Sequence, residues 1–141
     1  MRQEVTTTID APADLVWRTV KDVEKWPEWT PATMIEIRLE GDELRGGSVA
    51  TVRQPRQPVR TWTVTELAEG RSFTWASTGR GLRLSADHIV TEENGGTNVV
   101  LTFSLAGPMA PLANLFAGKA IRQAIASEAA SLKAWCERTS R

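Results

Sequence analysis

Residues 9–29 have the sequence IDAPADLVWRTVKDVEKWPEW and carry the strongest structural signal in the chain. Pro12 suits the first position of a helix, because its missing N–H needs no partner there and its φ angle is already helical. Four apolar residues then share one face of that helix: Ala13, Val16, Trp17 and Val20. A Trp-Pro-Glu-Trp elbow ends the segment at Trp29. We therefore expect a strand that ends at Ile9, a helix, and a second short helical turn.

The rest of the chain alternates as β-strands do and then ends in one long helix. Apolar and polar residues alternate over six segments that are separated by Gly, Asn or Pro, which is typical of antiparallel hairpins. These segments are 35–39, 48–54, 59–67, 72–77, 82–92 and 97–105, and 5–9 precedes them. From 112 to 137 the chain has no Pro, and apolar residues recur near helical spacing. These positions predict one long helix with an apolar face toward the sheet: Leu112, Leu115 or Phe116, Ile121, Ile125, Leu132, and Trp135 or Cys136.

The 9–29 segment and this order of elements resemble the START-like, helix-grip superfamily, specifically its polyketide cyclase/dehydrase-type lipid-binding family. The resemblance covers all 141 residues and implies a single domain, 1–141. It implies an α+β helix-grip fold, in which a curved antiparallel sheet of about seven strands wraps around the long C-terminal helix, with two short helices after the first strand. It also implies a ligand cavity between the sheet and that helix. The motifs are specific for the fold and only weakly specific for activity.

Charge and composition narrow the classes of partner. The chain has 17 basic and 17 acidic residues, so we expect no footprint for nucleic acid or an anionic membrane, both of which need clustered Lys and Arg. No apolar run approaches the ~20 residues that span a bilayer, and no signal-peptide core follows Met1. We therefore expect a soluble cytoplasmic protein without integral membrane association, either a monomer or a homodimer. The lone Cys136 forms no internal disulfide, and we predict neither a metal site nor a cofactor.

Strand alternation predicts which side chains face the interior. The inward set includes Trp62, Trp75, His88 and Phe103 together with aliphatic neighbours. These side chains suit stacking on a planar hydrophobic ligand, and we predict that they bind it. The alternation alone is equally compatible with a solid core, and the cavity is implied by the resemblance.

Two further ligand contacts are predicted outside the strands. The elbow closes one side of the cavity in relatives, so we expect Trp29 to contact a ligand; an aromatic cluster with Trp26 that anchors the small helices is the alternative. Met109 lies in a linker with two prolines, residues 106–111. Its flexible thioether suits a position at the cavity entrance.

Two residues are candidates for acid–base chemistry. His88 is the only histidine, and it is either a satisfied core residue or a polar group in an apolar pocket that acts near neutral pH. Asp87 cannot orient it, because adjacent strand residues point to opposite faces. Arg60 and Glu66 share the face of Trp62 near the strand ends. Of these, Arg60 is the first candidate for an arginine-based cyclase site.

The sequence favours a binding protein. We predict binding or transport of a small hydrophobic ligand, such as a lipid, an isoprenoid or an aromatic polyketide, in the internal cavity. The alternative is an enzyme of the polyketide cyclase/dehydrase type that uses His88 or Arg60. The chain has no HExxH, CxxC or GxSxG motif that would indicate another chemistry. A co-chaperone-like protein-interaction module is the second alternative, and it would need an exposed docking patch that the sequence does not show.

Overall fold

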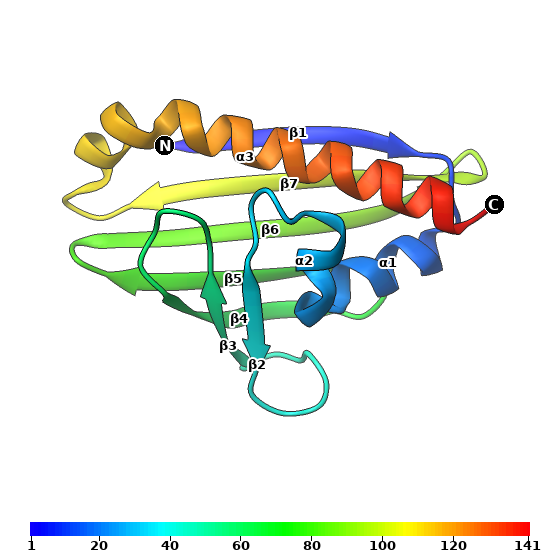
Figure 1. The fold of residues 1–141 in the computed structure, drawn as a ribbon, viewed down its shortest axis with the longest axis horizontal. Helices are drawn as coiled ribbons and strands as arrows, with labels where there is room; N and C mark the ends of the chain where they lie inside the picture. Colours follow the sequence, from blue (N-terminus) through cyan, green and yellow to red (C-terminus); the bar gives the residue numbers. More distant parts are fainter.

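One antiparallel sheet and a long C-terminal helix organise the chain (Figure 1). The computed structural model describes all 141 residues. The strands are β1 (Arg2–Ile9), β2 (Glu36–Leu39), β3 (Val49–Arg53), β4 (Arg60–Ala68), β5 (Ser72–Gly79), β6 (Leu82–Glu93) and β7 (Gly96–Ala106). The helices are α1 (Ala13–Lys21), the 3₁₀ turn η1 (Val23–Lys25), α2 (Trp26–Trp29) and α3 (Ala110–Thr139). The strand order is β1-β7-β6-β5-β4-β3-β2. Strands β2 to β7 therefore form a meander, and β1 pairs with β7 at the edge of the sheet. The expected α+β helix-grip fold is confirmed.

The segment between β1 and β2 follows the prediction with one shift. Pro12 is the residue before the helix, with φ −63° and ψ 145°, and α1 begins at Ala13. The Pro12 carbonyl still accepts a hydrogen bond from the Val16 amide at 3.1 Å, so it closes the first turn. Val16 and Trp17 are buried as expected. The short helix α2 then directs Trp26 into the core, where its indole N–H donates to the Val20 carbonyl at 3.0 Å.

A β-bulge changes the faces of β4. The pairing of β4 with β5 shifts between Val64 and Glu66, so one extra residue interrupts the alternation. Glu66 is exposed, and Leu67 packs against the core in its place. The expectation that Glu66 shares the inner face of Trp62 was therefore wrong, because strict alternation does not continue through a bulge.

Helix α3 lies along β1 and β7 and has two different halves (Figure 1). In the second half, Ile125, Leu132 and Cys136 are buried as expected. In the first half, the expectation was wrong: Leu112, Leu115 and Phe116 are exposed. The residues that face the sheet there are small, namely Ala113, Ala117, Ala120 and Ala124. None of the helices is both long enough and apolar enough to cross a membrane.

Candidate functional site

A cavity of about 620 Å³ lies between the sheet and the first half of α3. Large side chains of β4 to β7 form one wall, and alanines of α3 form the opposite wall. The connection between β3 and β4, with Gln54 to Gln57, borders the same space. Of the 26 residues that line the cavity, 17 are hydrophobic, so the interior suits an apolar ligand. The helix leaves this space open because an alanine does not reach across to the sheet.

Aromatic rings form a continuous surface on the sheet wall. Trp75 lies between two other indoles, with ring centroids 5.5 Å from Trp62 and 5.3 Å from Trp26. Phe103 extends the surface, 6.4 Å from Trp62. Such contacts fix the orientation of each ring, so the wall presents a rigid surface for stacking. His88 completes the surface next to Trp26, with ring centroids 5.3 Å apart.

His88 is held as a neutral imidazole. Its ring stacks on Phe73 at 4.2 Å, and its Nδ1 atom lies 3.2 Å from the Phe73 carbonyl oxygen. Because a carbonyl only accepts, Nδ1 carries the proton and Nε2 is left as a hydrogen-bond acceptor. Burial lowers the pKa of His88 to about 4, against the smaller opposing effects of the Phe73 carbonyl and Asp87. At neutral pH the cavity wall therefore offers an uncharged acceptor.

Asp87 has its own partners on the other side of the strand. Its carboxylate accepts hydrogen bonds from the hydroxyls of Thr74 at 2.8 Å and Thr102 at 2.5 Å. These two residues face Asp87 on the neighbouring strands β5 and β7. Asp87 accordingly makes no hydrogen bond to His88.

Glu128 is a cavity residue that sequence reasoning missed. It lies on α3 and lines the cavity together with Ala124 and Ile125. Burial raises the pKa of its carboxyl to about 7, and the Thr33 hydroxyl acts in the opposite direction. The signal was present in the sequence, because Glu128 is the one acidic residue between Glu93 and Glu137 and lies at helical spacing from Ile125 and Leu132, two residues of the predicted apolar face. A carboxyl with this pKa both donates and accepts protons near neutrality.

The structure brings four of the six predicted ligand contacts to the cavity wall. Trp62, Trp75, His88 and Phe103 line it, and so does the catalytic candidate Arg60, whose guanidinium lies 3.5 Å from the Ser77 hydroxyl.

Trp29 and Met109 lie off the wall. Trp29 packs edge-on against Trp26 at 5.9 Å, and its buried indole N–H has no acceptor. Met109 packs against Gly81 outside the cavity and is partly exposed. Ligand contact by all six residues stays a prediction.

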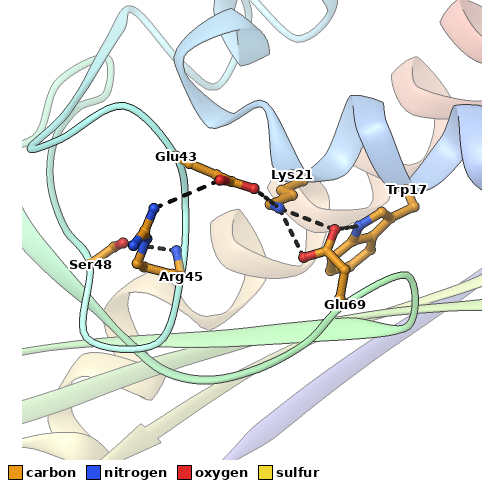
Figure 2. Close-up of polar contacts among 6 residues, drawn as sticks. All are labelled: Trp17, Lys21, Glu43, Arg45, Ser48 and Glu69. Atoms are coloured by element: carbon orange, nitrogen blue, oxygen red, sulfur yellow. Dashed lines mark hydrogen bonds and ion pairs between the residues drawn. The ribbon is translucent and has the colours of Figure 1, made fainter.

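The densest ion-pair network lies away from the cavity (Figure 2). Lys21 on α1 contacts Glu43 at 2.8 Å and Glu69 at 2.9 Å, and Glu69 also accepts the indole N–H of Trp17 at 2.9 Å. Hydrogen bonds to the two carboxylates raise the pKa of Lys21. This network ties α1 to two loops and has a structural role. No cluster of His, Cys, Asp or Glu in the structure is arranged to hold a metal ion.

Comparison with known proteins agrees with this architecture. The structure superposes on the Zhui aromatase/cyclase from Streptomyces sp. R1128 with a TM-score of 0.82 and 20% sequence identity, over 100% of this chain and 96% of that one. It also superposes on Ara h 8.0201, with a TM-score of 0.76 and 14% identity over 96% and 97% of the two chains. A major latex-like protein from Panax ginseng matches with a TM-score of 0.72 and 14% identity over the same fractions. At these identities the structures are similar in fold.

Sequence comparison gives the family. No curated protein sequence matches the chain. A family model described as polyketide cyclase/dehydrase and lipid transport matches residues 2–137, which is nearly the whole chain. The structural neighbours share the fold described above for this chain. The chain therefore belongs to the polyketide cyclase/dehydrase and lipid transport family, within the START-like helix-grip superfamily.

Proposed function

We propose that this protein binds a small, mainly apolar ligand in the cavity between its sheet and α3. The observation that carries the proposal is the cavity itself, whose volume of about 620 Å³ is within the range of small-molecule sites. Its aromatic wall favours a planar molecule, since ring faces stack on flat apolar surfaces. Lipids, isoprenoids and aromatic polyketides are the classes that meet these conditions.

Two polar groups restrict the ligand further. The Nε2 atom of neutral His88 accepts a hydrogen bond, so it favours a ligand with a hydroxyl group. Glu128, with a pKa of about 7, offers a second polar contact on the helix side. A polar group left without a partner inside an apolar site opposes binding, so we expect a hydroxylated ligand to bind more tightly than its fully apolar analogue.

A thermal-shift screen against sterols, quinones, fatty acids and aromatic polyketides tests the proposal. A ligand at 100 times its Kd should add about 2.7 kcal/mol to the free energy of unfolding. The test variant is Ala117→Phe, which fills the cavity from the helix side. The matched control is Gln123→Phe, which places the same side chain on the exposed side of α3.

We expect the wild type and Gln123→Phe to be stabilised by the same chemical class, and Ala117→Phe to lose that stabilisation. Equal stabilisation of both variants would mean that the ligand binds elsewhere. No stabilisation by any class would contradict the proposal for these ligands.

A second candidate function is an enzyme of the polyketide cyclase/dehydrase type. The observation that favours it is the presence of Glu128 and His88 in one cavity, because a carboxyl with a pKa near 7 and a neutral imidazole together supply a general acid and a general base. Incubation with a poly-β-ketone substrate, followed by mass spectrometry, distinguishes the two functions. An enzyme converts the substrate, and Glu128→Gln slows the conversion while binding persists. A binding protein releases the substrate unchanged.

A further inference from the structure

The first half of α3 leaves four apolar side chains uncovered at one end of the molecule. Met109, Leu112, Leu115 and Phe116 are 41%, 47%, 75% and 80% exposed. Leu115 and Phe116 are the two most exposed large apolar side chains in the protein. We call these four residues the α3 apolar patch. Helical spacing places Leu115 on the side of α3 opposite the alanines that face the cavity, and it places Leu112 and Phe116 on the flank between the two sides.

The charged side chains at this end are nearly all basic. Residues 53–60, 77–86 and 104–127 contain no Asp or Glu. They contain seven cations: Arg53, Arg56, Arg60, Arg80, Arg83, Lys119 and Arg122. Six of the seven are exposed, and none of the seven forms an ion pair in the structure. Lys119 and Arg122 continue the outer side of α3 directly after Phe116.

The three basic segments lie close together in space. The connection from β7 to α3 touches the β5–β6 hairpin, since the Met109 amide donates to the Gly81 carbonyl at 3.1 Å. A Cβ atom at Gly107 would lie only 2.6 Å from that same carbonyl oxygen. Leu82, Arg56 and Ala113, one from each segment, line the same cavity. Figure 1 shows the β5–β6 hairpin and the beginning of α3 at the same end of the sheet, with the β3–β4 connection rising toward α3.

Carboxylates near this end are already engaged. Glu4 pairs with Arg2 at 3.2 Å, and Glu36, which lies opposite Arg53 on the neighbouring strand, pairs with Arg38 at 3.4 Å. Asp87 accepts hydrogen bonds from two threonines. Glu128 lines the cavity. The zero net charge therefore conceals an uneven distribution of charged side chains over the surface. On the α3 side of the sheet this end carries Arg56, Arg60, Arg80, Lys119 and Arg122. Arg53 and Arg83 point to the opposite face, because they alternate with Val52, Leu82 and Leu84, which line the cavity.

We propose that this end of the protein docks on the surface of an anionic phospholipid bilayer. The α3 apolar patch would enter the boundary between headgroups and acyl chains, and the surrounding cations would lie among the anionic headgroups. The exposed apolar side chains match the acyl chains of such a bilayer, and the unpaired cations match its anionic headgroups. The cavity borders the same end, so a docked molecule would have its cavity next to the acyl chains. The docking does not depend on the proposed ligand.

Two other partners match the surface less well. A nucleic acid would contact the cations, but Leu115 and Phe116 would then face phosphates. A second copy of the chain in a twofold dimer would cover the apolar row, but it would also bring Lys119 and Arg122 of one copy close to those of the other. Of these three partners, the bilayer is the one that accommodates both features.

Flotation with phospholipid vesicles tests the proposal. We expect the ligand-free wild type to float with vesicles that contain phosphatidylglycerol, not with pure phosphatidylcholine, and to dissociate at high salt because the attraction is screened. Leu115→Glu/Phe116→Glu should lower the fraction bound roughly tenfold or more. Arg80→Glu/Lys119→Glu should do the same. All four side chains are exposed, so the variants should fold normally.

Matched controls place the same changes elsewhere on the surface. Ile35→Glu/Ile89→Glu changes two exposed isoleucines outside the patch, and Arg18→Glu/Arg71→Glu reverses two exposed cations outside the basic segments. Both control variants should float like the wild type.

Three outcomes would overturn the proposal. The first is a wild type that does not float with anionic vesicles at low salt. The second is equal flotation of the patch variants and their controls. The third is another partner on the same surface: a duplex oligonucleotide bound in place of vesicles, or a dimer detected by light scattering that Leu115→Glu/Phe116→Glu dissociates.

Discussion

The two halves of α3 are parts of one continuous helix, but one half packs in the core and the other borders the cavity. The second half packs as a core helix, with Ala129, Leu132 and Cys136 buried against the rest of the protein. The first half stands over the cavity with alanines on its inner side and large apolar residues on its outer side. Apolar residues recur at helical spacing in both halves. Which side of a helix is buried therefore depends on what lies beneath it, and an apolar stripe alone does not decide the question.

The two halves should differ most in how much the truncation of a leucine lowers the free energy of unfolding. Leu132→Ala removes a side chain that is 1% exposed and should lower the free energy of unfolding by about 2–5 kcal/mol. Leu115→Ala removes the same atoms from an exposed position and should change it by no more than about 0.5 kcal/mol. Urea denaturation measures both values. Losses of similar size would show that the first half of α3 packs as tightly as the second.

Glu128 lies where the two halves meet, and with His88 it should set the pH dependence of stability. The depressed pKa of His88 makes the unfolded chain bind more protons between pH 4 and 6.5, so its contribution to stability is lost as the pH falls through this range. The raised pKa of Glu128 has the opposite effect, and stability falls as the pH rises from 4.5 to 7.

The two effects should cancel where they overlap, between pH 4.5 and 6.5. In Glu128→Gln the free energy of unfolding should rise with pH by about 1.4 kcal/mol per unit, and in His88→Gln it should fall with a similar slope. Urea denaturation at several pH values gives both slopes. A flat profile in both variants would mean that neither group is buried as described.

A large side chain introduced on the inner side of α3 should lower the stability more in the second half than in the first. Ala129→Phe introduces a large side chain where the core is already packed and should cost about 1–3 kcal/mol. Ala117→Phe introduces the same side chain over the cavity and should change stability by less than about 1 kcal/mol. Thermal denaturation compares the two. A cost for Ala117→Phe equal to that of Ala129→Phe would argue against an open cavity.

The smallest effect concerns the polar network on α1, the helix that contacts α3 beside the packed half (Figure 2). Glu69→Gln removes the charge that holds Lys21 while it keeps an acceptor for Trp17. Because Glu69 is largely solvated, the loss should be below about 1 kcal/mol and should shrink at high salt. Urea denaturation at two salt concentrations checks this. A large, salt-independent loss would indicate a buried ion pair.

The sequence predicted the elements well because each has a local cause. Short stretches of sequence show each of these causes. They are the apolar face from Val16 to Val20, the alternation that directs Trp62 and Trp75 inward, and the lack of proline in α3 after its first turn. The face of α3 was predicted wrongly for a physical reason. A cavity is a lack of side-chain volume, and Ala117 gives a weaker apolar signal than Phe116.

Other features depend on long-range arrangement. The bulge between Val64 and Glu66 follows from pairing with β5, which no single strand reveals. The uneven charge around the start of α3 arises only because three distant segments, 53–60, 77–86 and 104–127, meet at one end of the fold. Glu128 could have been found, because a carboxylate at helical spacing from Ile125 and Leu132 on the predicted apolar face is unusual, but its raised pKa depends on the cavity walls around it.

Cys136 has a practical consequence for measuring this protein. It is the only thiol in the chain, it is fully buried in the packed half of α3, and burial raises its pKa. A thiol reagent reaches it only when that half of the helix detaches, so the rate of labelling reports local opening rather than surface chemistry. The native thiol therefore reports the local opening of the C-terminal segment, and no engineered residue is needed to measure it.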